Sequence, residues 1–394
     1  MHPRPVLDLA RDLGLRAEEL ESYGPWKAKV RLPAIERLGR ERPQGKLVVV
    51  TSINPTKQGE GKTTVTIGLA QGLQRLGKRA VIALREPSLG PVFGVKGGAT
   101  GGGASSLVPA QDINLHFTGD MHAVTAANNL LATLIDSHIH FGNALALDPT
   151  RIAWPRCLDM NDRALRQVVV GLGGSTHGPP REAGFVITAA SEVMAILCLA
   201  SGVEDLKVRL GRIIVGYRRD GSAVRASDLK AEGAMAVLLK DAIEPNLVQS
   251  TEGVPALVHG GPFANIAHGT SSVLAARLAE RLGDFVVTEA GFGADLGFEK
   301  FLHIFARTSG LAPACAVVVV TARAMKHHGG APEEGEDLAA LRRGLPNLDQ
   351  HLDIVRAFGV EPIVAINRFP HDTEAELAAL REHCARAGVR VALV

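Results

Sequence analysis

The sequence predicts an α/β fold with a doubly wound, mainly parallel sheet and a helix-rich insertion. Short apolar runs alternate along the chain with segments in which apolar residues recur at helical spacing. The apolar runs lack the polar alternation of half-exposed strands, which indicates strands covered by helices on both faces. The first run leads directly into a Gly-rich turn and a helical segment, the order that builds a parallel sheet.

Seven apolar runs and four periodic segments give the individual elements of this fold. The expected strands are Leu47–Ile53, Ala80–Leu84, Ala256–His259, Phe285–Thr288, Ala314–Thr321, Pro362–Ile366 and Val389–Val394. The expected helices are Lys62–Leu76, Thr270–Leu282, Leu348–Phe358 and Thr373–Ala387.

The pattern changes in the middle of the chain and divides it into three parts. Residues 1–150 hold the first strands and the Gly-rich turn, and residues 251–394 complete the sheet. Between them, residues 151–250 are read as a mainly helical insertion, because Val186–Ser201 and Ser227–Ile243 show helical spacing.

Composition limits the classes of partner. The chain has 394 residues, 46% of them hydrophobic, with 43 Lys and Arg against 41 Asp and Glu and a net charge of +2. Because no strong field would attract a polyanion, we expect neither nucleic acid nor a membrane as partner. The N-terminus lacks the apolar core of a signal peptide, and no run of 18 residues is free of polar interruption. These features predict a cytoplasmic protein.

Residues 54–64 predict a nucleotide site. A strand that leads through a Gly-rich turn to Lys-Thr-Thr at a helix start is the arrangement that holds phosphates, because free backbone N–H groups and the helix dipole favour anions. Lys62 supplies positive charge, and Thr63 is placed to reach Mg²⁺. Thr56 stands where the usual pattern has its first Gly. We therefore expect a P-loop NTPase-like fold that binds ATP or GTP. The residues expected around the nucleotide are Thr56, Lys57, Gln58, Gly59, Glu60, Gly61, Lys62, Thr63 and Thr64.

Lys57 leaves a second interpretation open. The stretch from Lys57 to Thr63 also resembles the variant loop of ATPases that partition chromosomes, in which a second lysine reaches across a dimer. Such a protein would hydrolyse ATP without a second small substrate.

Three other segments supply candidate residues around the same site. Arg85 follows the strand Ala80–Leu84, and a guanidinium fork there suits a phosphoryl group or a small carboxylate. Phe263 and Asn265 are candidates for contact with adenine, although Phe263 is equally consistent with core packing. Glu289 follows an apolar run and is a candidate Mg²⁺ ligand, an ion pair being the alternative.

Several long polar and Gly-rich strings together carry a family resemblance. They are Pro55-Thr-Lys-Gln-Gly-Glu-Gly-Lys-Thr-Thr64, Arg85-Glu-Pro-Ser-Leu-Gly-Pro91, Asp112-Ile-Asn-Leu-His-Phe-Thr-Gly-Asp120, Asp159-Met-Asn-Asp-Arg-Ala-Leu165, Gly261-Pro-Phe-Ala-Asn-Ile-Ala-His-Gly269 and Glu289-Ala-Gly-Phe-Gly-Ala-Asp-Leu-Gly297. With these strings the chain resembles the formate–tetrahydrofolate ligases, from about residue 20 to Val394.

The resemblance implies an ATP-dependent ligation of formate to tetrahydrofolate in two steps. Formate attacks the γ-phosphate of ATP to give formyl phosphate, and tetrahydrofolate then captures the formyl group, leaving 10-formyltetrahydrofolate, ADP and phosphate. Carried over to this chain, it makes Lys62 and Arg85 catalytic, with Arg85 gripping the formyl phosphate, and places the pterin ring against Phe369 and Pro370. It also implies Mg²⁺, a monovalent cation and a homotetramer.

The resemblance further implies a longer C-terminal part. The aromatic partner of Phe369 in the family lies beyond the strand at Val389–Val394, so we interpret residues 251–394 as including the start of a folate-side domain that is truncated at Val394. This keeps a further alternative open, a nucleotide-binding remnant of the ligase without catalysis.

Overall fold

The fold is centred on a large mixed sheet. The computed structural model describes residues 3–94, 98–332 and 335–394. Its main sheet has 12 strands, with the order β1-β2-β14-β15-β4-β16-β3-β17-β18-β19 and the short pair β5 and β6 attached beside β14. The run from β15 to β19 in this order is parallel throughout, whereas β14, β2 and β1 join it by antiparallel pairs.

The expected strands are confirmed to within one residue at each end. The parallel strands are β3 (Lys46–Ser52), β4 (Ala80–Leu84), β15 (Pro255–Val258), β16 (Phe285–Glu289), β17 (Pro313–Val320), β18 (Pro362–Ile366) and β19 (Arg390–Leu393). The antiparallel strands are β1 (Leu20–Ser22), β2 (Ala28–Val30), β5 (Gly101–Gly102), β6 (Ser105–Val108) and β14 (Asn246–Ser250). These were not expected, because each contains polar residues or glycine and none is a continuous apolar run.

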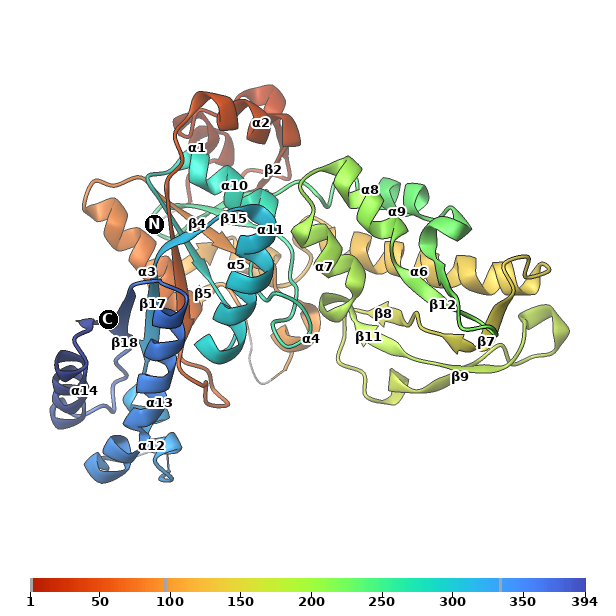
Figure 1. The fold of residues 1–394 in the computed structure, drawn as a ribbon. Helices are drawn as coiled ribbons and strands as arrows, with labels where there is room; N and C mark the ends of the chain where they lie inside the picture. Colours follow the sequence, from red (N-terminus) through yellow and green to blue (C-terminus); the bar gives the residue numbers. More distant parts are fainter. Residues whose placement is uncertain (1–2, 95–97, 333–334) are drawn as a thin grey trace.

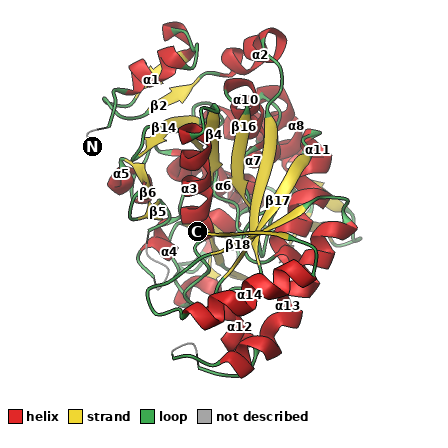
Figure 2. Cartoon of the chain, turned by 90° about the vertical axis from the view of Figure 1, so that its left-hand side faces the viewer, coloured by secondary structure: helices red, strands yellow, loops and turns green. Residues whose placement is uncertain are grey.

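The parallel strands are apolar throughout because both faces of the sheet are covered (Figure 2). On β3, Leu47 and Val49 join one core, with α10 (Val273–Leu282) and α13 (Leu338–Ala357). Val48 and Val50 face the opposite side, where α3 (Lys62–Arg75) packs. Each face thus takes every second residue of the strand.

The helices that cover the sheet agree closely with the expected ones, except that α13 (Leu338–Ala357) is longer than expected. α14 (Glu374–Arg386) begins one residue late, and α10 begins at Val273 rather than Thr270. α13 begins at Leu338, not Leu348, and contains Pro346. Leu341 and Leu345 are buried on its inner face, so packing maintains the helix across a residue that opposes helix formation. The remaining helices on this part are α1 (Val6–Asp12), α2 (Leu32–Glu41), α4 (Leu89–Val92), α5 (Ala110–Asn114), α11 (Arg307–Ser309) and α12 (Ala322–His328).

A second group of elements extends to one side of the sheet (Figure 1). Its helices are α6 (Asp120–His140), α7 (Glu192–Leu199), α8 (Val203–Gly211) and α9 (Glu232–Leu238), around a separate hydrophobic core. Its small sheets pair β7 (Leu147–Ile152), β12 (Ile214–Arg218) and β13 (Ala223–Arg225); β8 (Arg156–Leu158) and β11 (Phe185–Ile187); and β9 (Val168–Val170) and β10 (Arg181–Ala183).

Residues 151–250, expected to be mainly helical, contain these small sheets beside the helices α7, α8 and α9. Phe185–Ile187 is a strand and only Glu192–Leu199 of the expected Val186–Ser201 is α-helix. Three-residue strands are too short to show a period of two, so the sequence pattern could not distinguish them from helix or loop. Within the described ranges, no helix has the length and apolar character needed to cross a bilayer.

Candidate functional site

The candidate residues lie at one edge of the main sheet because its neighbouring parallel strands all end there. β3 is followed by residues 53–61, here the β3–α3 loop, and β4 is followed by Arg85. Between these two strands, β16 ends at Glu289. On the other side of β3, beyond β17, β18 is followed by residues 367–373, here the β18–α14 turn. Strand order therefore assembles residues from distant parts of the chain.

The β3–α3 loop is held from inside by Glu60. The backbone N–H of Thr56 donates to Glu60 Oε1 over 2.7 Å, and Thr321 Oγ1 donates to Glu60 Oε2 over 2.5 Å. Glu60 is only 1% exposed, so its carboxylate shapes the loop and points into the protein. Lys57 and Gln58, in contrast, are exposed at the tip of the loop.

Two glycines give this loop its course into α3. Gly59 and Gly61 both have φ of +78°, a left-handed conformation that favours glycine. Gly61 caps the N-terminus of α3, and a Cβ there would lie 2.4 Å from Asn367 Nδ2. The helix therefore begins with its first N–H groups at the sheet edge, where a helix dipole favours an anion.

Lys62 and Thr63 occupy the first turn of α3. Lys62 Nζ donates to Ser52 Oγ over 3.2 Å, which keeps its charge beside the end of β3. Thr63 Oγ1 donates to Glu289 Oε2 over 2.9 Å. The two residues proposed from sequence as Mg²⁺ ligands are thus in direct contact, and their oxygens belong to the hard ligand class that Mg²⁺ prefers.

Arg85 borders a small cavity beside this pair. The cavity has a volume of about 50 Å³, and Arg85, Phe263 and Glu289 are among its lining residues. Arg85 Nη1 donates to the backbone oxygen of Pro262 over 3.1 Å, and Arg85 makes no ion pair with any residue in the described ranges. A volume of this size holds only a few waters, which suits an anion as small as formate.

Burial shifts the pKa of two titratable groups near Arg85 in the direction that favours their uncharged forms. The pKa of Glu86 is raised well above its ordinary value by burial, with the charge of Asp120 adding to this effect. The pKa of His268 is lowered to about 3 by burial and, secondarily, by the charge of Arg85.

Phe263 and Asn265 lie after β15, in the loop that also carries His268. Phe263 is partly exposed and separates the cavity at Arg85 from a wider one of about 510 Å³, which Asn265, Arg163 and Arg166 also line. Asn265 is exposed. Phe263 borders both cavities and is not fully buried.

Phe369 and Pro370 are in the β18–α14 turn. Phe369 is half-buried, and the guanidinium carbon of Arg323 lies 4.9 Å from the centre of its ring, whereas Pro370 is exposed. Arg323 also donates to the β3–α3 loop, and Asn367 Nδ2 donates to the backbone oxygen of Glu60 over 2.9 Å. Sequence analysis missed Arg323 and Asn367, although both follow a predicted parallel strand just as Arg85 does.

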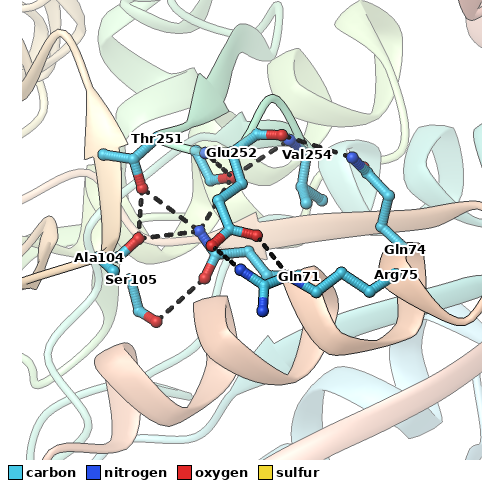
Figure 3. A network of polar contacts seen from close by, with 9 residues as sticks. Gln71, Gln74, Arg75, Ala104, Ser105, Thr251, Glu252 and Val254 are labelled. Carbon is cyan, nitrogen blue, oxygen red and sulfur yellow. Dashed lines mark hydrogen bonds and ion pairs between the residues drawn. The ribbon is translucent and has the colours of Figure 1, made fainter. Parts of the chain in front are cut away.

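A polar network anchors α3 away from the sheet edge (Figure 3). Gln71 Nε2 donates to the backbone oxygen of Ala104 over 3.0 Å, and Gln71 Oε1 accepts from Ser105 Oγ over 3.0 Å. Arg75 forms a two-bond ion pair with Glu252 on the same side. The network attaches the C-terminal half of α3 to the β5–β6 hairpin and to the turn after β14. Since Lys62 and Thr63 anchor the first turn, α3 is held at both of its ends.

Comparison with known proteins gives one family for the whole chain. The family model described as formate–tetrahydrofolate ligase matches residues 1–394. A formate–tetrahydrofolate ligase of Symbiobacterium thermophilum is 62% identical over 388 residues, which are 98% of this chain and 70% of the relative. One of Methylobacillus flagellatus is 58% identical over 392 residues, again 98% of this chain and 70% of the relative.

Proposed function

The chain belongs to the formate–tetrahydrofolate ligase family. From this premise we propose which of its residues take which role in the ATP-dependent ligation of formate to tetrahydrofolate. Formate, ATP and tetrahydrofolate are the substrates that the family implies. The observation that supports the assignment best is the contiguity of the β3–α3 loop, the Thr63–Glu289 pair and the cavity at Arg85.

The β3–α3 loop and the start of α3 hold the phosphates of ATP in this proposal. The first N–H groups of α3 and the Lys62 ammonium face the β- and γ-phosphates, and residues from Thr56 to Thr64 surround them. Their task is positioning and charge neutralisation, because phosphoryl transfer to a weak nucleophile has little use for covalent help from the protein.

Arg85 holds formate and then formyl phosphate. A formate oxygen forms a bond to the γ-phosphorus while the bond from phosphorus to the ADP oxygen breaks and ADP leaves. The N10 amine of tetrahydrofolate then attacks the formyl carbon, phosphate departs, and the amine releases a proton. The guanidinium fork matches the oxygen pairs of formate and of the phosphoryl group, so it stabilises the charge that develops on both.

Thr63 and Glu289 are the residues that would hold Mg²⁺. The fit is supported by these two adjacent oxygens, one from the first turn of α3 and one from the end of β16, beside a loop that offers N–H donors and an ammonium group. A bound Mg²⁺ would neutralise phosphate charge. For the monovalent cation we assign no residues, because the described ranges contain no cluster of three or more His, Cys, Asp or Glu side chains arranged to hold a metal ion.

The remaining assignments complete the proposal. Phe263 and Asn265 contact adenine, and Phe369 with Pro370 receives the pterin ring. The main sheet is a doubly wound P-loop NTPase-like domain into which the second group of elements is inserted, and the assembly is a homotetramer.

The test is release of ADP by the purified protein with Mg-ATP, in the presence and absence of formate and of tetrahydrofolate. We expect turnover to require both. Lys62→Met should remove most of it, because a charge-assisted phosphate contact contributes roughly 1.5–3 kcal/mol. Lys78→Met, which changes an exposed lysine beyond the far end of α3, serves as the control. ADP release that does not depend on formate or tetrahydrofolate would instead indicate a simple ATPase. No ADP release would indicate a nucleotide-binding remnant of the ligase without catalysis.

A further inference from the structure

Arg323 touches two regions to which the proposed function gives different ligands. Arg323 lies in the first turn of α12, where Nη1 donates to Gln58 Oε1 over 2.5 Å and Nη2 donates to the backbone oxygen of Gly59 over 2.6 Å. Its guanidinium carbon is 4.9 Å from the centre of the Phe369 ring. One side chain therefore joins the tip of the β3–α3 loop to the aromatic ring of the β18–α14 turn.

The base of the same loop is fixed separately. Asn367 Nδ2 donates to the backbone oxygen of Glu60, and Thr321 Oγ1 donates to the Glu60 carboxylate. Gly61 has no room for a Cβ on the Asn367 side. In contrast, Gln58 is exposed and Gly59 is partly exposed, and Gly59 has open space around its Cβ position. The tip has room to adjust, and Arg323 contacts the tip.

The guanidinium group is suited to coupling these two contacts. It is a rigid plane, so the direction of its two N–H bonds toward the loop and the direction of its face toward an aromatic ring cannot change independently. A shift of Gln58 and Gly59 on phosphate binding would consequently reorient the guanidinium group against the Phe369 ring. Phe369 itself is only half-buried, which leaves part of its ring for a planar ligand.

We propose that Arg323 is a positioning residue that couples nucleotide binding at the β3–α3 loop to binding of the pterin ring at Phe369. This inference rests on the proposed function, because it takes both ligand positions from it. Arg323 touches the loop and the ring but none of the reacting atoms. Thermodynamic reciprocity then requires that each ligand tighten binding of the other by the same factor.

The coupling is measured by calorimetric titration of tetrahydrofolate with and without saturating Mg-ADP, and of Mg-ADP with and without tetrahydrofolate. In the unmodified protein we expect Mg-ADP to lower the tetrahydrofolate Kd by about fivefold or more, a usual size for coupling between sites. Arg323→Met keeps the length of the side chain but removes its charge and donors, and should bring this factor close to one. Arg323→Lys keeps a charge near the ring without the fork and should restore part of it.

Two further variants make the test specific. Arg343→Met removes an exposed arginine that donates to the backbone oxygen of Gly329 at the other end of α12, and should leave the coupling unchanged. Gln58→Ala removes one acceptor of Arg323 at an exposed position, and should weaken the coupling even if Arg323→Met does not fold.

The outcomes separate this inference from the function on which it rests. Full coupling in both Arg323→Met and Gln58→Ala overturns it, as do independent affinities in the unmodified protein. Failure of the unmodified protein to bind nucleotide overturns the proposed function itself. Loss of coupling with retained Mg-ADP binding in Arg323→Met supports the inference, because a merely structural arginine would not affect the ratio of two affinities.

Discussion

Thr63 Oγ1 donates a hydrogen bond to Glu289 Oε2 over 2.9 Å, across 226 residues of sequence. The contact arises because β16 pairs in parallel with β3, with Glu289 opposite Val50, so that β16 ends beside the start of α3. A buried carboxylate there would repel the phosphates of ATP. Repulsion of this kind is relieved when a divalent cation lies between the two anions, and Thr63 supplies a neutral oxygen next to it.

From this contact we predict a specific effect of Glu289→Gln on Mg²⁺ dependence. Without Mg²⁺, the variant should bind ATP more tightly than the unmodified protein, because the repelling charge is gone. Adding Mg²⁺ should improve ATP binding about tenfold or more in the unmodified protein but only about threefold or less in the variant, in line with about 1.5–3 kcal/mol for a contact to a charged group. Nucleotide titrations with Mg²⁺ or with a chelator measure this. Glu361→Gln, at the opposite end of the sheet, is the control, and equal Mg²⁺ dependence in both variants would refute the assignment of Glu289.

Arg85→Lys should separate turnover from nucleotide binding. A lysine retains the positive charge at the cavity but presents no fork to formate or to the transferring phosphoryl group. We expect kcat to fall by about 10²-fold or more, and the Kd of ATP to change by about threefold or less. Initial rates and equilibrium titrations on the same preparation give both numbers. If kcat and the affinity for ATP fell by similar factors, Arg85 would be a structural residue or a plain nucleotide ligand.

Gly61→Ala and Gly59→Ala form a matched pair. Both glycines have φ of +78°, so both substitutions carry the cost of a left-handed alanine, about 1–2 kcal/mol. Only at position 61 would the new Cβ meet a neighbour, Asn367 Nδ2 at 2.4 Å, whereas nothing lies within 4 Å at position 59. Urea denaturation should therefore show a larger loss in the free energy of unfolding for Gly61→Ala than for Gly59→Ala. The affinity for ATP should also fall more in Gly61→Ala than in Gly59→Ala. Equal effects would mean that Asn367 moves aside at no cost.

The parallel sheet was predictable from sequence because each of its strands carries the signal on its own. Val48 and Val49 pack into the cores on opposite faces of the sheet. A strand covered on both faces is therefore a continuous apolar run, which can be recognised without knowing its neighbouring strands. The Gly-rich turn was predictable for the same reason, since the left-handed Gly61 and the following Lys62 are adjacent in the chain.

The rest depended on contacts between distant residues. β9 is the run Val168–Val170, which is partly exposed and pairs with β10. Nothing in three valines distinguishes a surface hairpin from a helix turn. The inward direction of Glu60 depends on Thr321, which meets it only because β17 lies beside β3. Arg323 was overlooked although it follows β17, because its significance depends on the position of Phe369 in the turn after the neighbouring strand β18.

His259 should make the folded state sensitive to mild acid. Its Nδ1 and Nε2 lie 2.6 Å from Ser272 Oγ and 2.7 Å from the Ala242 backbone oxygen, and burial lowers its pKa from 6.5 to about 4, with a smaller opposing effect from Asp120. Between these two pH values the unfolded chain binds a proton that the folded protein does not, so the free energy of unfolding falls as pH is lowered through this window. The contribution of His259 is about 1.4 kcal/mol per pH unit. His259→Gln should reduce the slope of unfolding free energy against pH by about this amount, leaving the share of His268, whereas exposed His140→Gln should not change it. Urea denaturation at several pH values within the window measures the slope, and an unchanged slope in His259→Gln would mean that this histidine is already charged in the folded protein.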